Sequence, residues 1–261
     1  MQVFVVGAPR SGTTIVTQAL NAHDQIKIFD EIGLIDMLDL GGVVVGKLRA
    51  FLIERGGYGD YCARVQNGEN PAAALRQVIS ALTAPKPIWG EKNPMYATRL
   101  DTLRRGFPDA QFLFVVRDPR EIVNSCLLYR DSPARSRHDF WIKDSVTDAL
   151  ALVERCWEPL GTRQSDVSIV RYERFIAGPK ATLDHVFAAW QVQFPAEAMV
   201  GAHAAPDTVG DLQFFRRGAT LPWKLANLSP IRPETPPRER VDASDPAWTR
   251  VDDLAARFGY A

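Results

Sequence analysis

The sequence predicts one α/β domain, a three-layer sandwich in which helices cover both faces of a central parallel sheet. The first observation behind this prediction is that short apolar runs alternate along the chain with segments of helical spacing. The second is that these runs are apolar almost throughout, as strands are when both faces of a parallel sheet are covered. The third is size, because 261 residues with 46% hydrophobic side chains suffice for one domain with a sizeable core.

The expected strands and helices follow one another in the order that such a sheet requires. Strands are expected at residues 3–6, 26–28, 87–90, 111–116 and 167–170. Helices are expected at residues 13–22, 72–82, from 119 onward, 138–157 and 180–190. A proline-rich segment at 230–240 is expected to be irregular and to wrap around the domain. Ligands of parallel sheets bind beyond the carboxyl ends of the strands, so we expect the site in the loops there.

Composition argues against several kinds of partner. The formal net charge is zero, so no overall field points to nucleic acid or to an anionic membrane surface. The three cysteines (Cys62, Cys126 and Cys156) are far apart and are expected to be free thiols in a reducing compartment. No basic and apolar leader opens the sequence, and no apolar run is long enough to span a membrane. We therefore expect a cytoplasmic protein without a membrane span.

The loop after the first strand is the most informative segment, and it reads Gly7-Ala8-Pro9-Arg10-Ser11-Gly12-Thr13-Thr14. A glycine-bounded loop between a buried strand and a helix directs several backbone N–H groups to one point, where the helix dipole also favours an anion. The spacing of its two glycines matches a nucleotide P-loop and predicts a P-loop NTPase-like fold. Thr13, however, stands where ATPases and kinases carry lysine, and the cation is Arg10 instead. The loop therefore predicts a phosphate-type ligand without the usual ATP chemistry.

A second candidate anion site follows the strand expected at 111–116. Arg117 ends that strand and Ser125 lies on the helix that follows, and this pair resembles a motif with which sulfotransferases hold a phosphate of their cofactor. A guanidinium can bind a phosphate group through two hydrogen bonds, and a serine hydroxyl can add a neutral donor. A surface ion pair between Arg117 and Asp118, worth about 0.5 kcal/mol, is the alternative. Because the glycine loop is expected at the same edge of the sheet, we favour the phosphate site.

The segment Pro9-Arg10-Ser11-Gly12-Thr13-Thr14 resembles the 5′-phosphosulfate loop of the sulfotransferases that use 3′-phosphoadenosine 5′-phosphosulfate (PAPS). With arginine inside the loop, it is similar to the tyrosylprotein-sulfotransferase branch and its bacterial relatives. The resemblance implies that these residues bind PAPS. It also implies that Arg117 and Ser125 hold the 3′-phosphate, the group that distinguishes PAPS from ATP metabolites.

Two further segments resemble cofactor-binding parts of the same family. Arg216-Arg217-Gly218, followed by Trp223-Lys224, is similar to an Arg-Lys-Gly segment that folds over the cofactor and contacts its 3′-phosphate. Arg217 replaces the lysine and keeps the charge. Tyr172, followed by Glu173, resembles the tyrosine at the adenine side of the family's site. A half-buried tyrosine at a strand end is the alternative interpretation of Tyr172.

Transfer to an acceptor needs a base that takes the acceptor's proton. Cytosolic sulfotransferases use a histidine in a Lys-x-His motif, but the similar segment here, Glu91-Lys92-Asn93-Pro94, has Pro94 in that place. The tyrosylprotein branch uses a glutamate in a Glu-Glu pair after the first helix, and Asp30-Glu31 occupies that place. The resemblance implies Glu31 as the base and Asp30 as the second candidate. A pair of surface carboxylates is the alternative.

The resemblance also implies that Lys92 and Arg10 are fixed positive charges beside the transferred group. Sulfuryl transfer should resemble phosphoryl transfer, in which positioning and electrostatics supply most of the catalysis. No histidine or cysteine cluster and no acidic triplet in the sequence suits a metal ion, so we expect none to be required.

The sequence thus predicts a PAPS-dependent sulfotransferase that acts on a hydroxyl group, with an amine as the second choice of acceptor. Residues 32–85 and 128–165 match no motif and are expected to build the acceptor pocket. A small molecule is the preferred acceptor, while a lipid, a glycan and a peptide tyrosine stay open. The alternatives are a nucleotide-dependent kinase or phosphotransferase with a degenerate P-loop, and a nucleotide-binding protein without turnover.

Overall fold

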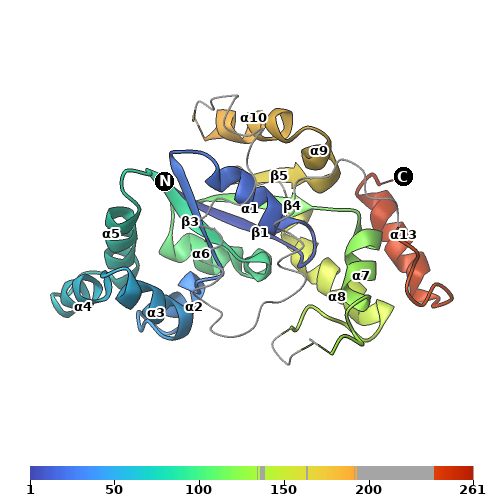
Figure 1. Cartoon of the computed structure of the whole chain (residues 1–261), viewed down its shortest axis with the longest axis horizontal. Coiled ribbons are helices and arrows are strands. Elements are labelled where there is room, and N and C mark those ends of the chain that lie inside the picture. Colours follow the sequence, from blue (N-terminus) through green and yellow to red (C-terminus); the bar gives the residue numbers. More distant parts are fainter. Residues whose placement is uncertain (134, 136–138, 163, 191, 193–237, 261) are drawn as a thin grey trace.

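In the part of the chain that the structure describes, five parallel strands form one sheet in the order β2-β3-β1-β4-β5 (Figure 1). The strands are β1 (Gln2–Gly7), β2 (Ile26–Asp30), β3 (Ile88–Lys92), β4 (Gln111–Val116) and β5 (Val167–Arg171). They belong to a computed structural model that describes residues 1–133, 135, 139–162, 164–190, 192 and 238–260. Because each neighbouring pair of strands is parallel, their carboxyl ends all lie at one edge.

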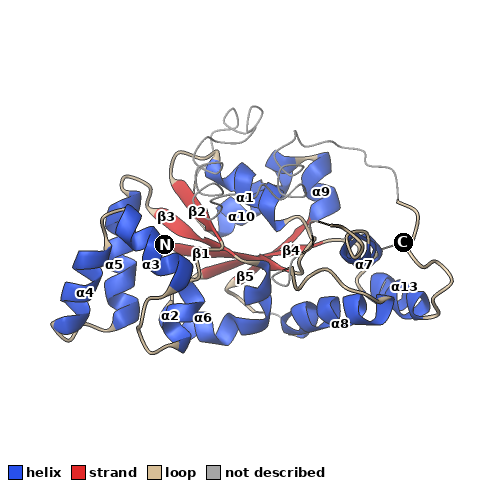
Figure 2. Cartoon of the chain, turned by 60° about the horizontal axis from the view of Figure 1, so that its bottom comes forward, coloured by secondary structure: helices blue, strands red, loops and turns tan. Residues whose placement is uncertain are grey.

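Helices cover both faces of this sheet, as Figure 2 shows, and the predicted α/β class is confirmed. One face carries α1 (Thr13–Asn21), α9 (Tyr172–Ala177) and α10 (Pro179–Ala189). The core on the other face includes side chains of α2 (Leu34–Asp39), α3 (Gly46–Glu54), α4 (Tyr58–Gln66), α5 (Pro71–Thr83), α6 (Leu100–Gly106), α7 (Pro119–Leu127), α8 (Val146–Trp157) and α13 (Ala247–Arg257). The described residues also form two short 3₁₀ helices, η1 (Pro94–Arg99) and η2 (Glu158–Gly161).

Strand β1 shows how the sequence builds both layers. Successive side chains of a strand point to opposite faces of the sheet. Val3 and Val5 lie in the core beneath α1, α9 and α10, whereas Phe4 and Val6 lie in the larger core of the opposite face. All four side chains are fully buried. A strand covered on both faces has no solvent-facing positions, which explains why this run is apolar throughout.

Most of the expected elements are confirmed, with small changes at their ends. β4 has the expected bounds, and α1, α5, α10 and β5 differ from the predicted ranges by one residue at one or both ends. The helix expected at 138–157 is wrong at its start, because α8 begins at Val146. Ser145 caps it there, and its Oγ accepts a hydrogen bond from the N–H of Asp148 at 3.1 Å.

Residues 238–241 lie against α7 near the end of the chain. The Asn124 side chain donates a hydrogen bond to the carbonyl of Glu239 (2.8 Å) and accepts one from the N–H of Val241 (2.7 Å). Of the segment expected to wrap around the domain, only 238–240 belongs to the described residues. The cysteines are free thiols, as predicted. None of the helices described has the length and apolar character that a membrane span needs.

Candidate active site

Residues from the ends of four strands, or from the segments that follow them, meet at the carboxyl edge of the sheet. Arg10, after β1, hydrogen-bonds Ser125 of α7, which follows β4. Lys92, the last residue of β3, forms ion pairs with Asp30 and Glu31 at the end of β2. Since β1 lies between β3 and β4, these two groups of residues are neighbours along the edge. The fold therefore brings together residues that are far apart in the sequence, as a site at this edge requires.

The glycine loop leads directly into the first turn of α1. Gly12 has a φ of 98°, and a Cβ atom there would lie 2.3 Å from the ring of Tyr172, so only glycine fits. Within the described chain, no side chain caps the N-terminus of α1, and the buried Oγ of Ser11 has no hydrogen-bond partner. Helix N-terminal N–H groups bind anions in this arrangement. The residues predicted for this loop all lie in it or in the first turn of α1: Pro9, Arg10, Ser11, Gly12, Thr13 and Thr14.

The guanidinium of Arg10 is held on several sides. Its Nε donates a hydrogen bond to the Oγ of Ser125 at 2.9 Å. The same group lies over the rings of Trp141 and Tyr129, 4.8 Å and 5.6 Å from their centroids. Burial lowers the pKa of Arg10, although an arginine remains charged in proteins. Arg10 also has a φ of 74°, a conformation that a non-glycine residue adopts only where its surroundings enforce it.

Arg117 connects the second predicted anion site to the glycine loop. Its Nη1 donates a hydrogen bond to the carbonyl of Arg10 at 3.2 Å, and its Nη2 lies 3.2 Å from a carboxylate oxygen of Glu121. Its guanidinium lies 4.6 Å from the centroid of the Tyr172 ring. Tyr172 is the first residue of α9 and not part of β5, and its ring stands between Gly12 and Arg117. The two predicted anion sites thus form one continuous region.

Lys92 is the centre of a buried charge cluster. Its side chain is 1% exposed and forms ion pairs with the carboxylates of Asp30 and Glu31, the latter at 2.7 Å. Burial by itself lowers the pKa of Lys92, but the two carboxylates outweigh it and raise the pKa above its usual range. Lys92 therefore remains an ammonium ion.

The two carboxylates beside Lys92 differ in their access to solvent. The Asp30 side chain is 6% exposed, whereas the Glu31 side chain is 30% exposed. Glu31 also has a φ of 54°, and its N–H donates a hydrogen bond to the carbonyl of Lys92 at 2.9 Å. Of the two residues predicted as candidate bases, Glu31 is therefore the one more open to solvent.

Glu91 is a site residue for which the sequence analysis assigned no role. Its side chain is fully buried, and its carboxylate accepts hydrogen bonds from the N–H groups of Gly33 (2.8 Å) and Leu34 (2.9 Å). The hydroxyl of Tyr96 donates a third, at 2.9 Å. Burial raises the pKa of Glu91 to about 7, although these donors oppose the rise. A charged pair, Glu91-Lys92, in a short strand is the sequence signal that could have drawn attention to it.

Other contacts at the site could not be read from the sequence. Tyr129 and Trp141 hold Arg10, but the sequence offers no motif that links them to the glycine loop. The predicted cofactor residues Arg216, Arg217 and Gly218 lie outside the described residues.

Comparison with known proteins identifies the family of this chain. A model of the sulfotransferase family matches residues 2–196, which include all five strands and the site residues placed above. The chain belongs to the sulfotransferase family.

Several protein-tyrosine sulfotransferases are similar to about half of this chain. Protein-tyrosine sulfotransferase 1 of Mus musculus is 33% identical over 128 residues, which are 48% of this chain and 33% of that protein. The Drosophila melanogaster protein-tyrosine sulfotransferase is 28% identical over 127 residues, 48% of this chain and 25% of that protein. The chain thus spans a third or less of these relatives.

Two solved sulfotransferase domains share the fold along nearly the whole chain. The domain from the curacin biosynthetic pathway has a TM-score of 0.65 at 14% identity, with 99% of this chain and 97% of that chain covered. The domain from the Synechococcus PCC 7002 olefin synthase has a TM-score of 0.61 at 19% identity, with coverages of 100% and 95%. Sulfotransferases have a P-loop NTPase-like fold, so the predicted fold is confirmed.

Proposed function

We propose that this sulfotransferase moves the sulfuryl group of PAPS to a hydroxyl group of a small molecule, with an amine as the second choice of acceptor. The observation that carries the proposal is the 2.9 Å hydrogen bond between Arg10 and Ser125. It joins the loop that resembles the family's 5′-phosphosulfate site to the helix that resembles its 3′-phosphate site. A donor with an anionic group at each of these positions fits the pair, and PAPS is such a donor.

The residues present fit the donor. The backbone N–H groups from Ser11 to Thr14 and the unpartnered Ser11 hydroxyl would bind the 5′-phosphosulfate. Arg117 and Ser125 would bind the 3′-phosphate, together with the Arg216-Arg217-Gly218 segment. Tyr172, which contacts both anion-binding parts, would border the nucleotide. PAPS, when bound, supplies the activated sulfuryl group.

In the transfer itself, Glu31 takes the proton of the acceptor hydroxyl while the acceptor oxygen attacks sulfur. A bond forms between sulfur and the acceptor oxygen, and the bond between sulfur and the phosphate oxygen breaks. The electron pair of that bond leaves with adenosine 3′,5′-bisphosphate. Arg10 and Lys92, both held in place as described, stabilise the negative charge that develops on the leaving group. No metal ion takes part in this scheme.

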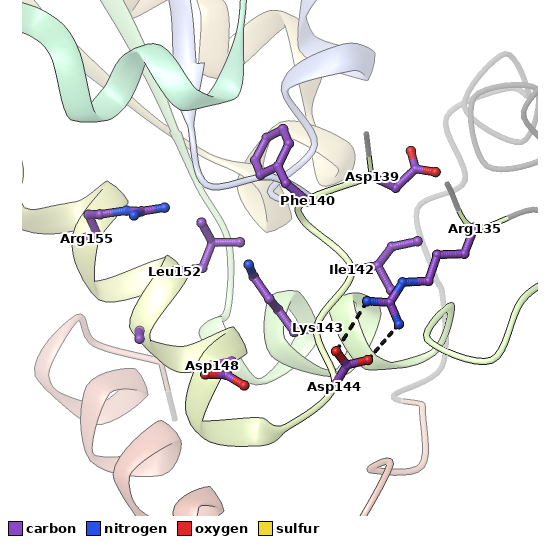
Figure 3. Close-up of a pocket in the computed structure, with 10 residues that line it drawn as sticks. Arg135, Asp139, Phe140, Ile142, Lys143, Asp144, Asp148, Leu152 and Arg155 are labelled. Atoms are coloured by element: carbon purple, nitrogen blue, oxygen red, sulfur yellow. Dashed lines mark hydrogen bonds and ion pairs between the residues drawn. The ribbon is translucent and has the colours of Figure 1, made fainter. Parts of the chain in front are cut away.

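A cavity of about 620 Å³ offers a place for the acceptor (Figure 3). The segment 139–144 forms one of its walls, and the same segment places Trp141 over the guanidinium of Arg10. This volume is in the range of small-molecule sites. Apolar, basic and acidic side chains line it: Phe140, Ile142 and Leu152, then Arg135, Lys143 and Arg155, and then Asp139, Asp144 and Asp148. The cavity belongs to the stretch 128–165 that the sequence analysis assigned to the acceptor, and we propose it as the acceptor site.

Filling this cavity should weaken acceptor binding selectively. Ala151 is an exposed residue of α8 that lines the cavity, so Ala151→Trp adds bulk there without removing a core side chain. We expect the KM for the acceptor to rise about tenfold, which corresponds to ~1.4 kcal/mol. Affinity for adenosine 3′,5′-bisphosphate should not change. Ala63→Trp, at an exposed position of α4, is the matched control. An unchanged acceptor KM in Ala151→Trp would place the acceptor elsewhere.

The Ser125 hydroxyl should form a hydrogen bond with the 3′-phosphate of the nucleotide. Ser125→Ala removes one hydrogen bond to a charged group, so we expect affinity for adenosine 3′,5′-bisphosphate to fall about tenfold (~1.5 kcal/mol). Adenosine 5′-monophosphate lacks the 3′-phosphate, and its affinity should hardly change. Both affinities can be measured by calorimetric titration. Equal losses for the two ligands would mean that Ser125 does not contact the 3′-phosphate.

The donor assignment is tested first by calorimetric titration of the unmodified protein with adenosine 3′,5′-bisphosphate and, in parallel, with ATP and Mg²⁺. We expect micromolar affinity for the bisphosphate, about −8 kcal/mol, and little binding of ATP. A preference for ATP with Mg²⁺ would overturn the proposal and support a phosphotransferase. Binding of the bisphosphate without transfer to any acceptor would support a nucleotide-binding protein without turnover.

A further inference from the structure

One strand, β3, holds the turn that carries Glu31, and it does so from both faces of the sheet. Lys92 and Glu91 are adjacent in β3, so their side chains point to opposite faces. On one face, the Lys92 ammonium pairs with the Glu31 carboxylate at 2.7 Å. On the other face, the Glu91 carboxylate accepts the N–H groups of Gly33 and Leu34. The backbone of Lys92 adds a third connection by accepting the N–H of Glu31 at 2.9 Å.

Tyr96 extends the Glu91 side of this arrangement. Its hydroxyl donates to Oε2 of Glu91 at 2.9 Å and accepts the N–H of Ile35 at 3.1 Å. Three successive backbone N–H groups, at residues 33, 34 and 35, therefore donate hydrogen bonds to Glu91 and Tyr96. These groups open α2, which has no side-chain cap from its own N-terminus in the described structure.

Capping a short helix with a buried glutamate has a high desolvation free energy, because the carboxylate is removed from water. Serine, threonine or aspartate at the N-cap of the helix does so locally, without a buried ionisable group. A carboxyl in the interior is tolerated only where it is fully hydrogen-bonded, as Glu91 is. The turn that it holds contains Glu31, whose φ of 54° is sparsely populated for non-glycine residues. Such conformations persist where the surrounding structure enforces them, and they gather at functional sites.

We propose that Glu91 is a positioning residue for sulfuryl transfer: by accepting the N–H groups of Gly33 and Leu34, its carboxylate fixes the turn that orients Glu31 beside Lys92. The inference rests on the proposed role of Glu31 as the base. Glu91 itself touches neither donor nor acceptor in this scheme, because it is fully buried on the face opposite to Lys92.

The order of the turn that carries Glu31 should depend on pH, because the Glu91 carboxylate can be protonated. Burial raises the pKa of Glu91 to about 7, and the charge of Glu31 adds to the rise. Other titratable groups near it are Tyr96, whose hydroxyl faces it, Asp36, which acts on Tyr96, and Lys92, the next residue of β3 on the opposite face. When Glu91 is protonated, one of its oxygens can no longer accept an N–H group in the same way. The turn should therefore loosen as the pH falls below about 7.

The test compares Glu91→Gln with Tyr96→Phe and with Glu54→Gln, an exposed glutamate of α3 that serves as the control. Glutamine keeps the shape of the side chain but has one acceptor oxygen in place of two. Amide hydrogen exchange at Gly33 and Leu34 should become about tenfold faster in Glu91→Gln, since one hydrogen bond at the turn is lost. Tyr96→Phe keeps the carboxylate, so it should accelerate exchange at Ile35 more than at Gly33.

The kinetic arm uses PAPS and 4-nitrophenol as the probe acceptor. In Glu91→Gln we expect kcat to fall about tenfold or more, as a misplaced base requires, while affinity for adenosine 3′,5′-bisphosphate is unchanged. The rise of kcat through about pH 7 should be missing in this variant. Unchanged exchange at Gly33 and Leu34, or an unchanged pH profile, would overturn the inference.

A wrong assignment of Glu31 as the base would give a different result from a wrong assignment of Glu91 as its positioning residue. If Glu31→Gln turned over normally, Glu31 would lose its role and the positioning role of Glu91 with it, whatever the exchange rates. Accelerated exchange in Glu91→Gln with normal kcat would retain Glu31 as the base but overturn Glu91 as its positioning residue. Should Glu91→Gln fail to fold, Tyr96→Phe removes the hydrogen bonds that Tyr96 makes to Glu91 and Ile35, so faster exchange at Ile35 and a lower kcat are expected, and a normal kcat would overturn the inference.

Discussion

Arg10→Ala should slow sulfuryl transfer by about 100-fold or more, equivalent to ~3 kcal/mol. The guanidinium of Arg10 is held by Ser125 and lies over the rings of Trp141 and Tyr129, so it is fixed before the donor binds. A charge that is already in place at the site where negative charge develops stabilises the transition state without a cost of reorganisation. Removing it should therefore lower kcat more than it weakens binding of the donor.

The measurement is single-turnover transfer from PAPS, alongside calorimetric affinity for adenosine 3′,5′-bisphosphate. Arg105→Ala, at an exposed position of α6, is the control for loss of an arginine in general. Arg10→Lys separates charge from shape, because lysine keeps the charge but cannot reproduce the planar fork of donors. It should recover only part of the rate. Near-normal transfer in Arg10→Ala would remove Arg10 from the catalytic scheme.

Strands and helices that are marked by their own residues, for example by an apolar run, could be predicted from the sequence. The run at 111–116 predicted β4 with its observed bounds, because each residue from Phe112 to Val116 is buried in a core. Elements whose signals are weak or nonlocal were not predicted. α2 has six residues, and its first N–H groups donate hydrogen bonds to Glu91 and Tyr96, so nothing in its own sequence marks its start. The predicted start of α8 is wrong because Ser145 caps the helix, so the helix begins only at Val146.

The candidate site was predictable to a similar extent. A compact motif identifies Arg10, and the close approach of Tyr172 explains the glycine at position 12. The partners of that motif come from other strands and helices, and only the fold brings them near. Ser125 and Lys92 were found through resemblance to a family, whereas Trp141 and Glu91 have no motif of their own. Tertiary contacts between distant segments are the information that one sequence does not display.

Glu31→Gln should lower kcat by about 100-fold or more, the usual contribution of a general base. Glutamine has nearly the same size and shape but cannot accept the acceptor's proton. The substitution should leave the fold intact, because Lys92 keeps its ion pair with Asp30 and remains compensated in the interior. The backbone hydrogen bond from residue 31 to the carbonyl of Lys92 is also unaffected by the change of side chain.

Asp30→Asn distinguishes the two carboxylates beside Lys92. Asp30 is almost fully buried and Glu31 is partly exposed, so only Glu31 can reach an acceptor. Asp30→Asn removes charge from the interior, and we expect it to lower stability more than it lowers kcat. Glu31→Gln should do the reverse, with affinity for adenosine 3′,5′-bisphosphate within about twofold of the unmodified protein, or ~0.4 kcal/mol. A loss of kcat confined to Asp30→Asn would transfer the role of base to Asp30, since the two residues differ here chiefly in their access to the acceptor.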